Sequence, residues 1–199
     1  MLPTPSAVLL DFDGTVCQLF AHTNLDATRS LLAEILANHS MPIRHSMDPF
    51  QIFADLADSS AYGLLRSSVL HELATQIDYV LTQLELKAVG TAPVVAGAAE
   101  FLKLLESHRI PFGVVTNNSQ SAVDLFARTR LPMMLGAPVI GRQPLRPDLL
   151  KPNPWGLRTL AATLGEQIGR TTWLVGDSLA DVLAGQEAGC SIVGMGSTT

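Results

Sequence analysis

The second half of the chain alternates short apolar runs with amphipathic segments, and this pattern restricts the fold more than any other feature of the sequence. Residues 100–107 have the periodicity of a helix, whereas 112–115 form a continuous apolar run that is typical of a buried strand. Ser119 or Ser121 is expected to cap the next helix, and Gly189 is expected to end the last one. We predict strands at 112–115, 138–141, 172–175 and 191–194, and helices at 100–107, 119–130, 154–164 and 179–188. Strands that alternate with helices form a parallel sheet with right-handed crossovers, so the predicted fold class is α/β with a Rossmann-like parallel sheet.

An earlier part of the chain, residues 18–89, departs from this alternation. It contains no convincing strand, and two stretches, 28–38 and 61–84, have helical periodicity. Pro42 and Pro49 indicate a loop between them. We interpret the region as a helical insert between the first strand and the rest of the sheet. The predicted domains are therefore a core of residues 1–17 and 90–199 and an insert of residues 18–89.

Two carboxylates follow directly after the first predicted strand, Ala7–Leu10, in the run Asp11-Phe12-Asp13-Gly14-Thr15. Like charges at this spacing repel each other, and each carboxylate loses hydration when it is partly buried. A divalent cation between Asp11 and Asp13 would relieve the repulsion, and so would the use of one of them as a nucleophile. Because open α/β sheets bind their ligands at the carboxyl ends of the strands, the run predicts chemistry at this edge.

Composition and charge exclude several classes of protein. The chain has 199 residues, of which 47% are hydrophobic and 16% charged, so it can bury a sizeable core. A net charge of −5 with scattered Lys and Arg predicts neither nucleic-acid nor membrane partners. No apolar stretch reaches the ~18 residues that span a bilayer, and the first residues lack the features of a signal peptide, which favours a cytoplasmic protein. Cys17 and Cys190 form neither a disulfide framework nor a metal-binding pattern. We expect a monomer or a homodimer.

Four motifs in a fixed order connect this chain to a known superfamily. They are Asp11–Thr15, then Thr116-Asn117, then Lys151-Pro152-Asn153-Pro154, and then Gly176–Asp181. In this order and at strand ends, they resemble the motifs of the haloacid dehalogenase-like hydrolase superfamily, and specifically its phosphoglycolate phosphatase-like subgroup. The resemblance covers essentially the whole chain, because the insert lies where members of that subgroup have a helical cap.

The resemblance implies a Mg²⁺-dependent phosphatase that acts on a small phosphorylated metabolite. Asp11 matches the nucleophile that forms an aspartyl-phosphate, and Asp13 matches the general acid and base. The family pattern supplies Mg²⁺ ligands from the Asp11 carboxylate, the Asp13 backbone carbonyl and the Asp177 carboxylate. Asp181 lies one helical turn beyond Asp177 and is included in the predicted metal site, where we expect it to orient a bound water or Lys151.

Further residues match the part of the family pattern that binds the phosphoryl group. The Thr116 hydroxyl and the Asn117 amide are expected to donate hydrogen bonds to phosphoryl oxygens near a helix N-terminus. Lys151 is expected to offset negative charge on the phosphoryl group and on the nucleophile. Gly14 would permit the tight loop after the nucleophile. His22 lies close to the loop that leaves the site and is a candidate substrate contact.

One departure from the family pattern affects the substrate. The stretch Val16-Cys17-Gln18-Leu19-Phe20 lacks the acidic residue that many relatives have at the entrance to the cap, so phosphoglycolate is not carried over. Two alternatives stay open, namely a phosphomutase or phosphotransferase that uses the same intermediate and a non-catalytic protein that binds a metabolite. Dehalogenation is less well supported, because that reaction does not need Asp13 as an acid for the leaving group.

Overall fold

A computed structural model describes residues 4–41, 48–57 and 67–196. Its strands form one parallel sheet in the order β3-β2-β1-β4-β5. The strands are β1 (Ala7–Leu10), β2 (Phe112–Val115), β3 (Val139–Ile140), β4 (Thr172–Gly176) and β5 (Ser191–Gly194). β1 lies in the middle of the sheet, and all of its residues are buried. β2 and β4 are its neighbours on the two sides. The predicted α/β class with a parallel sheet is confirmed.

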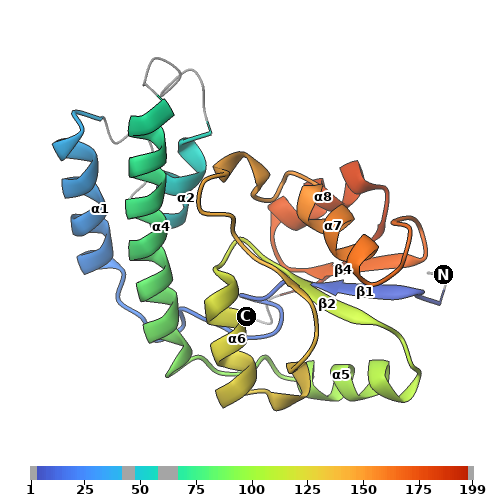
Figure 1. Cartoon of the computed structure of the whole chain (residues 1–199). Coiled ribbons are helices and arrows are strands. Elements are labelled where there is room, and N and C mark those ends of the chain that lie inside the picture. The colour runs from blue at the N-terminus through green and yellow to red at the C-terminus, as the bar shows by residue number, and fades with distance from the viewer. Residues whose placement is uncertain (1–3, 42–47, 58–66, 197–199) are drawn as a thin grey trace.

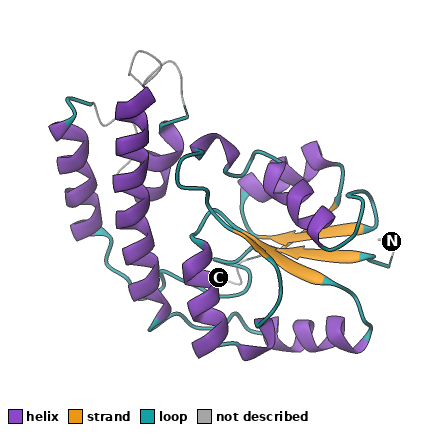
Figure 2. Ribbon diagram, viewed as in Figure 1, coloured by secondary structure: helices purple, strands orange, loops and turns teal. Residues whose placement is uncertain are grey.

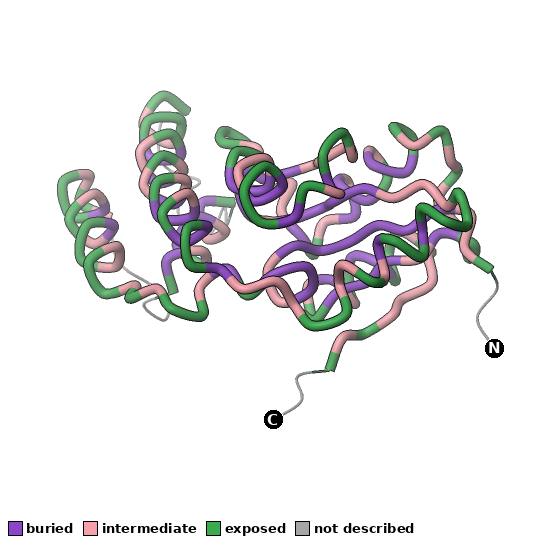
Figure 3. Tube along the Cα trace, turned by 90° about the horizontal axis from the view of Figure 1, so that it is seen from below, coloured by how far each residue is buried: buried purple, intermediate pink, exposed green. Residues whose placement is uncertain are grey.

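Helices cover both faces of the sheet (Figures 1 and 2). The helices are α5 (Ala98–Ser107) and α6 (Gln120–Thr129) on one face, and α7 (Trp155–Thr163) and α8 (Leu179–Ala188) on the other. Side chains alternate along β1 because successive residues of a strand point to opposite faces. Val8 and Leu10 join the core cluster on the α5 and α6 side, and Leu9 joins the cluster on the α7 and α8 side. Figure 3 colours the chain by burial and shows buried segments in its interior, whereas β3 and β5 at the edges of the sheet contain no buried residue.

The helix ends follow the capping residues of the sequence. Of the two predicted caps of α6, the structure uses Ser119, whose hydroxyl accepts a hydrogen bond from the Ala122 amide. Gly189 ends α8 as predicted, in a left-handed conformation with φ of +81° that favours glycine. At the other end of α8, Ser178 and Asp181 form a reciprocal capping box. These caps place the starts of α6 and α8 at the same edge of the sheet as the predicted motifs.

The insert contains α1 (Asp26–Asn38), α2 (Pro49–Asp55) and α4 (Ser67–Val89), which pack around an apolar cluster of their own. The prediction of a loop at Pro49 was wrong, because this residue begins α2. Proline is tolerated in the first turn of a helix, and the Asp48 side chain caps the Phe50 amide. Part of the predicted helix 61–84 lies outside the described residues, and the described part continues to Val89.

α4 connects this insert to the core beneath the sheet. Leu73, Ile77 and Leu81 belong to the apolar cluster of the insert, whereas Ala88 and Val89 belong to the core cluster of α5 and α6. Figure 1 shows the helix running from the insert to α6, against which it packs. The boundaries of the two domains at residues 17/18 and 89/90 remain a prediction. Within the described ranges, no helix combines the length and the apolar character needed to cross a membrane.

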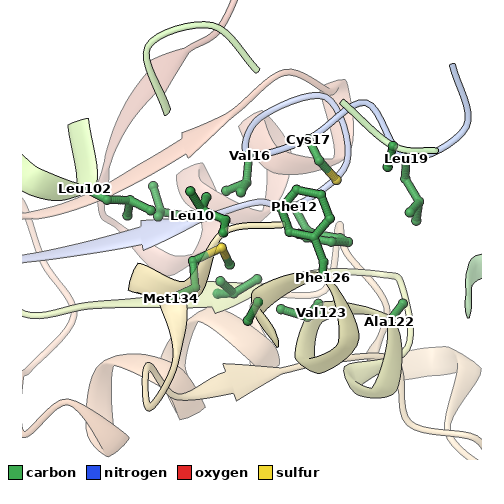
Figure 4. Packing of buried hydrophobic residues seen from close by; sticks show 14 of the residues in the cluster. Leu10, Phe12, Val16, Cys17, Leu19, Leu102, Ala122, Val123, Phe126 and Met134 are labelled. Carbon is green, nitrogen blue, oxygen red and sulfur yellow. The ribbon is translucent and has the colours of Figure 1, made fainter. Parts of the chain in front are cut away.

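A cluster of buried apolar side chains supports the loop after β1 (Figure 4). Phe12 is fully buried and packs edge-to-face on Phe126 of α6, with ring centroids 5.3 Å apart and an interplanar angle of 83°. Because the Phe12 ring is fixed in the core, its neighbours Asp11 and Asp13 are held at the carboxyl end of β1. The core thereby positions the first motif.

Candidate active site

Segments that are far apart in the sequence meet at the carboxyl end of the sheet. Asp11 directly follows β1, Thr116 directly follows β2, and Asp177 directly follows β4. Lys151 lies in the loop before α7, and Asp181 lies in the first turn of α8. Parallel strands that end together at one edge form the crevice in which α/β proteins bind ligands.

Lys151 is the centre of this arrangement. Its Nζ atom donates to Asp11 Oδ1 at 2.5 Å, to Asp181 Oδ1 at 2.6 Å and to the Val115 carbonyl at 3.1 Å. Burial lowers the pKa of Lys151, but the charges of Asp11 and Asp181 outweigh it and hold that pKa above its ordinary value. The side chain is therefore an ammonium ion at neutral pH with all three protons donated.

Burial has the opposite effect on the two carboxylates of the first motif. It raises the pKa of Asp11 to about 6, against the attraction of Lys151. It also raises the pKa of Asp13 to about 6, against the Leu19 amide, which donates to Asp13 Oδ1 at 2.6 Å. Each carboxylate therefore accepts a proton more readily than an exposed aspartate does.

Three carboxylates offer oxygen atoms to a metal ion. One oxygen each from Asp11, Asp177 and Asp181 lies within 4.8 Å of the others. Asp181 is already engaged on both sides, because Oδ1 accepts from Lys151 and Oδ2 accepts from the Ser178 amide at 3.1 Å and hydroxyl at 2.5 Å. Asp11 uses only one oxygen in these contacts, so Asp11 and Asp177 can each offer a carboxylate oxygen, which suits Mg²⁺, since that ion is bound in proteins by one or two carboxylates and several waters. The donor set fits the predicted metal.

Gly14 makes room for one of these carboxylates. Its φ of +87° is left-handed, and a Cβ atom at this position would overlap the Asp177 carboxylate. The glycine after Asp13 therefore allows the loop from β1 and the loop from β4 to approach each other.

The two residues of the second motif have different partners. The Thr116 hydroxyl donates to Asn118 Oδ1 at 2.9 Å and accepts from the Asn118 amide at 3.1 Å. The Asn117 side chain binds the backbone of Lys151 in both directions, since Oδ1 accepts from the amide at 2.8 Å and Nδ2 donates to the carbonyl at 3.0 Å. The sequence predicted that the backbone amide of Asn117 binds a phosphoryl group. The two hydrogen bonds between the Asn117 side chain and the Lys151 backbone were not predicted.

His22 is not brought together with this cluster. It is exposed and lines a groove of about 520 Å³ between the segment 22–24, α1 and α4. Neither Asp11 nor Lys151 lines that groove. Contact of His22 with a substrate remains a prediction.

Three buried polar residues lie beside the site and were not predicted from the sequence, namely Glu85, Asn118 and Arg142. Asn118 continues the polar run after β2. Glu85 follows Leu84 and precedes Ala88 on the buried side of α4, and an acid on such an apolar face signals a buried partner. Arg142 follows a strand that is only two residues long and has no comparable signal.

Known proteins share both the sequence pattern and the fold. The family model of the haloacid dehalogenase-like hydrolases matches residues 5–189. A curated relative, the haloacid dehalogenase-like hydrolase domain-containing protein At2g33255 of Arabidopsis thaliana, is 33% identical over 111 residues. That alignment covers 55% of this chain and 43% of the relative, so the matched region spans less than half of that protein's length.

Two solved structures have the same fold at low sequence identity. A predicted phosphoglycolate phosphatase from Haemophilus somnus is 19% identical with a TM-score of 0.60, over 98% of this chain and 86% of that one. A hydrolase of the same family from Deinococcus radiodurans, with bound phosphate and sodium, is 20% identical with a TM-score of 0.56, over 96% and 80% of the two chains. Since the family model matches nearly the full length and the motif residues converge at one edge of the sheet, this chain belongs to the haloacid dehalogenase-like hydrolase family.

Proposed function

We propose that this protein is a Mg²⁺-dependent phosphatase that hydrolyses a small phosphorylated metabolite through an aspartyl-phosphate on Asp11. One observation carries the proposal, namely a buried carboxylate at the end of the central strand, held by the buried Lys151 ammonium and adjacent to the open Asp177 carboxylate. The carboxylate can act as a nucleophile, and the Lys151 ammonium beside it, together with a metal ion when one is bound, would compensate the charge of an incoming phosphoryl group.

In the first half-reaction, the chain's own residues supply a nucleophile and an acid. Lys151 engages Oδ1 of Asp11, and Oδ2 attacks phosphorus and forms the new O–P bond. The bond between phosphorus and the alcohol oxygen breaks, and the protonated Asp13 carboxyl gives its proton to that oxygen. The Leu19 amide holds the Asp13 side chain in place for this transfer.

In the second half-reaction, Asp13 reverses its role. Its carboxylate takes a proton from a water molecule, the water oxygen bonds to phosphorus, and the bond between phosphorus and Asp11 breaks. Inorganic phosphate is released and the Asp11 carboxylate is restored. Thr116 and the Asn117 amide bind the phosphoryl oxygens, for which the Thr116 hydroxyl turns from Asn118 toward the substrate.

Asp11 and Asp177 would hold the metal, with the Asp13 backbone carbonyl as a further ligand. When bound, Mg²⁺ neutralises charge between the carboxylate nucleophile and the phosphate. Asp181 acts indirectly, because its oxygens are used to fix Lys151 and the start of α8. The bound phosphate of the Deinococcus radiodurans neighbour supports a phosphate ligand for this fold. We do not extend phosphoglycolate to this chain, because Val16–Phe20 lacks an acidic residue.

Hydrolysis of p-nitrophenyl phosphate tests the proposal. The wild-type protein is assayed with Mg²⁺ and with EDTA, and an Asp11→Asn variant is assayed with Mg²⁺. We expect turnover only for the wild type with Mg²⁺, because the asparagine amide cannot form the aspartyl-phosphate. Full turnover by Asp11→Asn, purified free of contaminating phosphatase, would contradict the mechanism.

A further inference from the structure

A buried ionic cluster lies directly behind the second motif. Arg142 is only 5% exposed and uses every nitrogen of its guanidinium. Nε donates to Asp78 Oδ1 at 2.6 Å, and Nη2 donates to Thr82 Oγ1 at 3.1 Å. Nη1 donates to Glu85 Oε1 at 2.7 Å and to the Asn117 carbonyl at 3.0 Å. One side chain from the loop after β3 thus joins α4 to the loop after β2.

Glu85 makes the complementary contacts. Its side chain is fully buried, and Oε2 accepts from the Ser119 amide at 2.9 Å. Oε1 accepts from Asn118 Nδ2 at 3.2 Å in addition to Arg142. The loop of residues 116–119 is therefore held at a carbonyl by Arg142 and at an amide and a side chain by Glu85.

These contacts extend to the Thr116 hydroxyl. The amide group of Asn118 donates to Glu85 through Nδ2, and its Oδ1 atom faces Thr116 Oγ1 at 2.9 Å. Glu85 determines which way this amide is turned, since a carboxylate accepts hydrogen bonds only. The Asn118 backbone amide also donates to Thr116 Oγ1 at 3.1 Å, and this contact is kept when the hydroxyl proton turns toward a substrate. A residue of the helical insert thus positions the Thr116 oxygen through Asn118.

A buried ion pair often contributes little net free energy, because desolvation of both charges offsets their attraction. The contacts do, however, place two groups that the proposed function assigns to phosphoryl binding, the Thr116 hydroxyl and the Asn117 amide. We propose that Arg142 and Glu85 are positioning residues of this active site, which fix the loop of residues 116–119 against α4 so that it can bind a phosphoryl group. This inference rests on the proposed function.

The arrangement also connects phosphate binding to the insert. The Arg142 guanidinium carbon lies 5.6 Å from the centroid of the Phe53 ring on α2, so two helices of the insert contact the arginine. Arg142 thus contacts α2, α4 and the loop of residues 116–119 with one side chain.

An Arg142→Met variant tests the inference against a matched control. Arg146→Met removes the same charge from an exposed arginine that pairs with Asp148. We expect Arg142→Met to lower kcat/KM for p-nitrophenyl phosphate by about 10–100-fold, by analogy with the loss seen when residues that orient metal ligands are replaced. We also expect the Kd of inorganic phosphate, measured by calorimetry with Mg²⁺, to rise about tenfold. Arg146→Met should leave both quantities within about twofold.

A second pair of variants guards against loss of the fold. Glu85→Gln keeps the size of the side chain, and Asn118→Ala leaves the Arg142–Glu85 pair in place. Each variant should raise the Kd of inorganic phosphate. The double variant Arg142→Met with Asn118→Ala should raise this Kd by less than the product of the two single fold-changes, because both residues act through one loop. A purely structural role would lower Tm and leave phosphate binding by the folded protein unchanged.

The two proposals fail in different ways. An inactive wild type that binds phosphate, with a higher phosphate Kd in Arg142→Met but not in Arg146→Met, would overturn the phosphatase and keep the positioning role. An active wild type, with Arg142→Met and Arg146→Met indistinguishable in kcat/KM and in phosphate Kd, would overturn the positioning role alone.

Discussion

At the residue scale, the site depends on contacts that tolerate little change. The Lys151 ammonium donates three hydrogen bonds, and both carboxylate oxygens of Asp181 accept hydrogen bonds. Gly14 leaves no space for a side chain beside the Asp177 carboxylate. Each of these residues acts on a neighbour, so a substitution is expected to alter the partner's function as well as its own.

Replacing Gly14 by alanine should affect metal binding as well as stability. The left-handed backbone alone should lower the free energy of unfolding by about 1–2 kcal/mol. The Cβ atom also overlaps the Asp177 carboxylate, so the Mg²⁺ concentration for half-maximal activity should rise about tenfold or more.

Gly165→Ala is the matched control for this variant. Gly165 has a φ of +77°, and a Cβ atom there would meet nothing within 4 Å. We expect a similar loss of stability in urea denaturation with an unchanged Mg²⁺ requirement. The same Mg²⁺ dependence for both variants would show that the contact with Asp177 has no role in metal binding.

At the scale of elements, the first turn of α8 contains a residue, Asp181, that belongs both to the helix cap and to the candidate active site. The Ser178 hydroxyl accepts from the Asp181 amide at 3.2 Å and donates to Asp181 Oδ2. Oδ1 of the same carboxylate accepts from Lys151. The helix cap and the orientation of the lysine therefore depend on one side chain.

Ser178→Ala should consequently reduce both stability and turnover. Loss of the cap should cost about 1 kcal/mol. Because Asp181 loses a hydrogen bond that orients it toward Lys151, we also expect kcat to fall by about tenfold, as for other residues that orient a catalytic group. Ser178→Thr keeps the hydroxyl and should restore most of both. Thermal unfolding and p-nitrophenyl phosphate kinetics measure the two effects, and unchanged kcat in Ser178→Ala would separate the cap from catalysis.

α4 is the element that joins the two apolar clusters. Its periodicity was visible in the sequence, whereas its end at Val89 depends on Ala88 and Val89 packing beneath the sheet. α2 was missed because Pro49 was interpreted as a loop residue, and the packing of Ile52 and Phe53 in the insert stabilises a helix too short to form by itself.

At the scale of the whole molecule, the two cysteines report on opposite faces of the sheet. Cys17 lies in the core cluster on the α5 and α6 side, and Cys190 packs against the cluster on the α7 and α8 side. Burial raises the pKa of Cys17 and raises the pKa of Cys190 to about 11. Since the thiolate is the reactive form, folding should protect both thiols.

Alkylation by iodoacetamide should therefore follow unfolding. At pH 8 a thiol with a pKa near 11 is about 0.1% thiolate, compared with about 25% for an ordinary cysteine. We expect the native protein to react about 100-fold more slowly than the protein in urea, and the rate at Cys190 to rise about tenfold per pH unit up to pH 10. Mass spectrometry after proteolysis assigns each site, and rapid modification of native Cys190 at pH 8 would contradict this prediction.

Most of the sheet and most of the site could be predicted from local signals. Hydrophobic periodicity and capping residues act over a few positions, so the strands and α-helices after residue 98 occur close to where the sequence predicts them, whereas the 3-10 helices Pro132–Met134 and Pro147–Leu149 were not predicted. Asp11, Thr116 and Asp177 each follow a predicted strand, and parallel strands end at a common edge, so their grouping follows from the predicted strands. The sequence by itself therefore determined the α/β sheet and the positions of these three residues, whereas Lys151 was assigned to the site by its resemblance to a family motif.

Tertiary structure decided the contacts between residues that have no local relation. Arg142 and Glu85 are separated by 57 positions, and the hydrogen bonds between Asn117 and Lys151 join residues 34 positions apart. Their side chains meet because α4 packs on α6 beside the loops after β2 and β3. Sequence periodicity does not predict these contacts, because they depend on how whole helices and loops pack around the sheet.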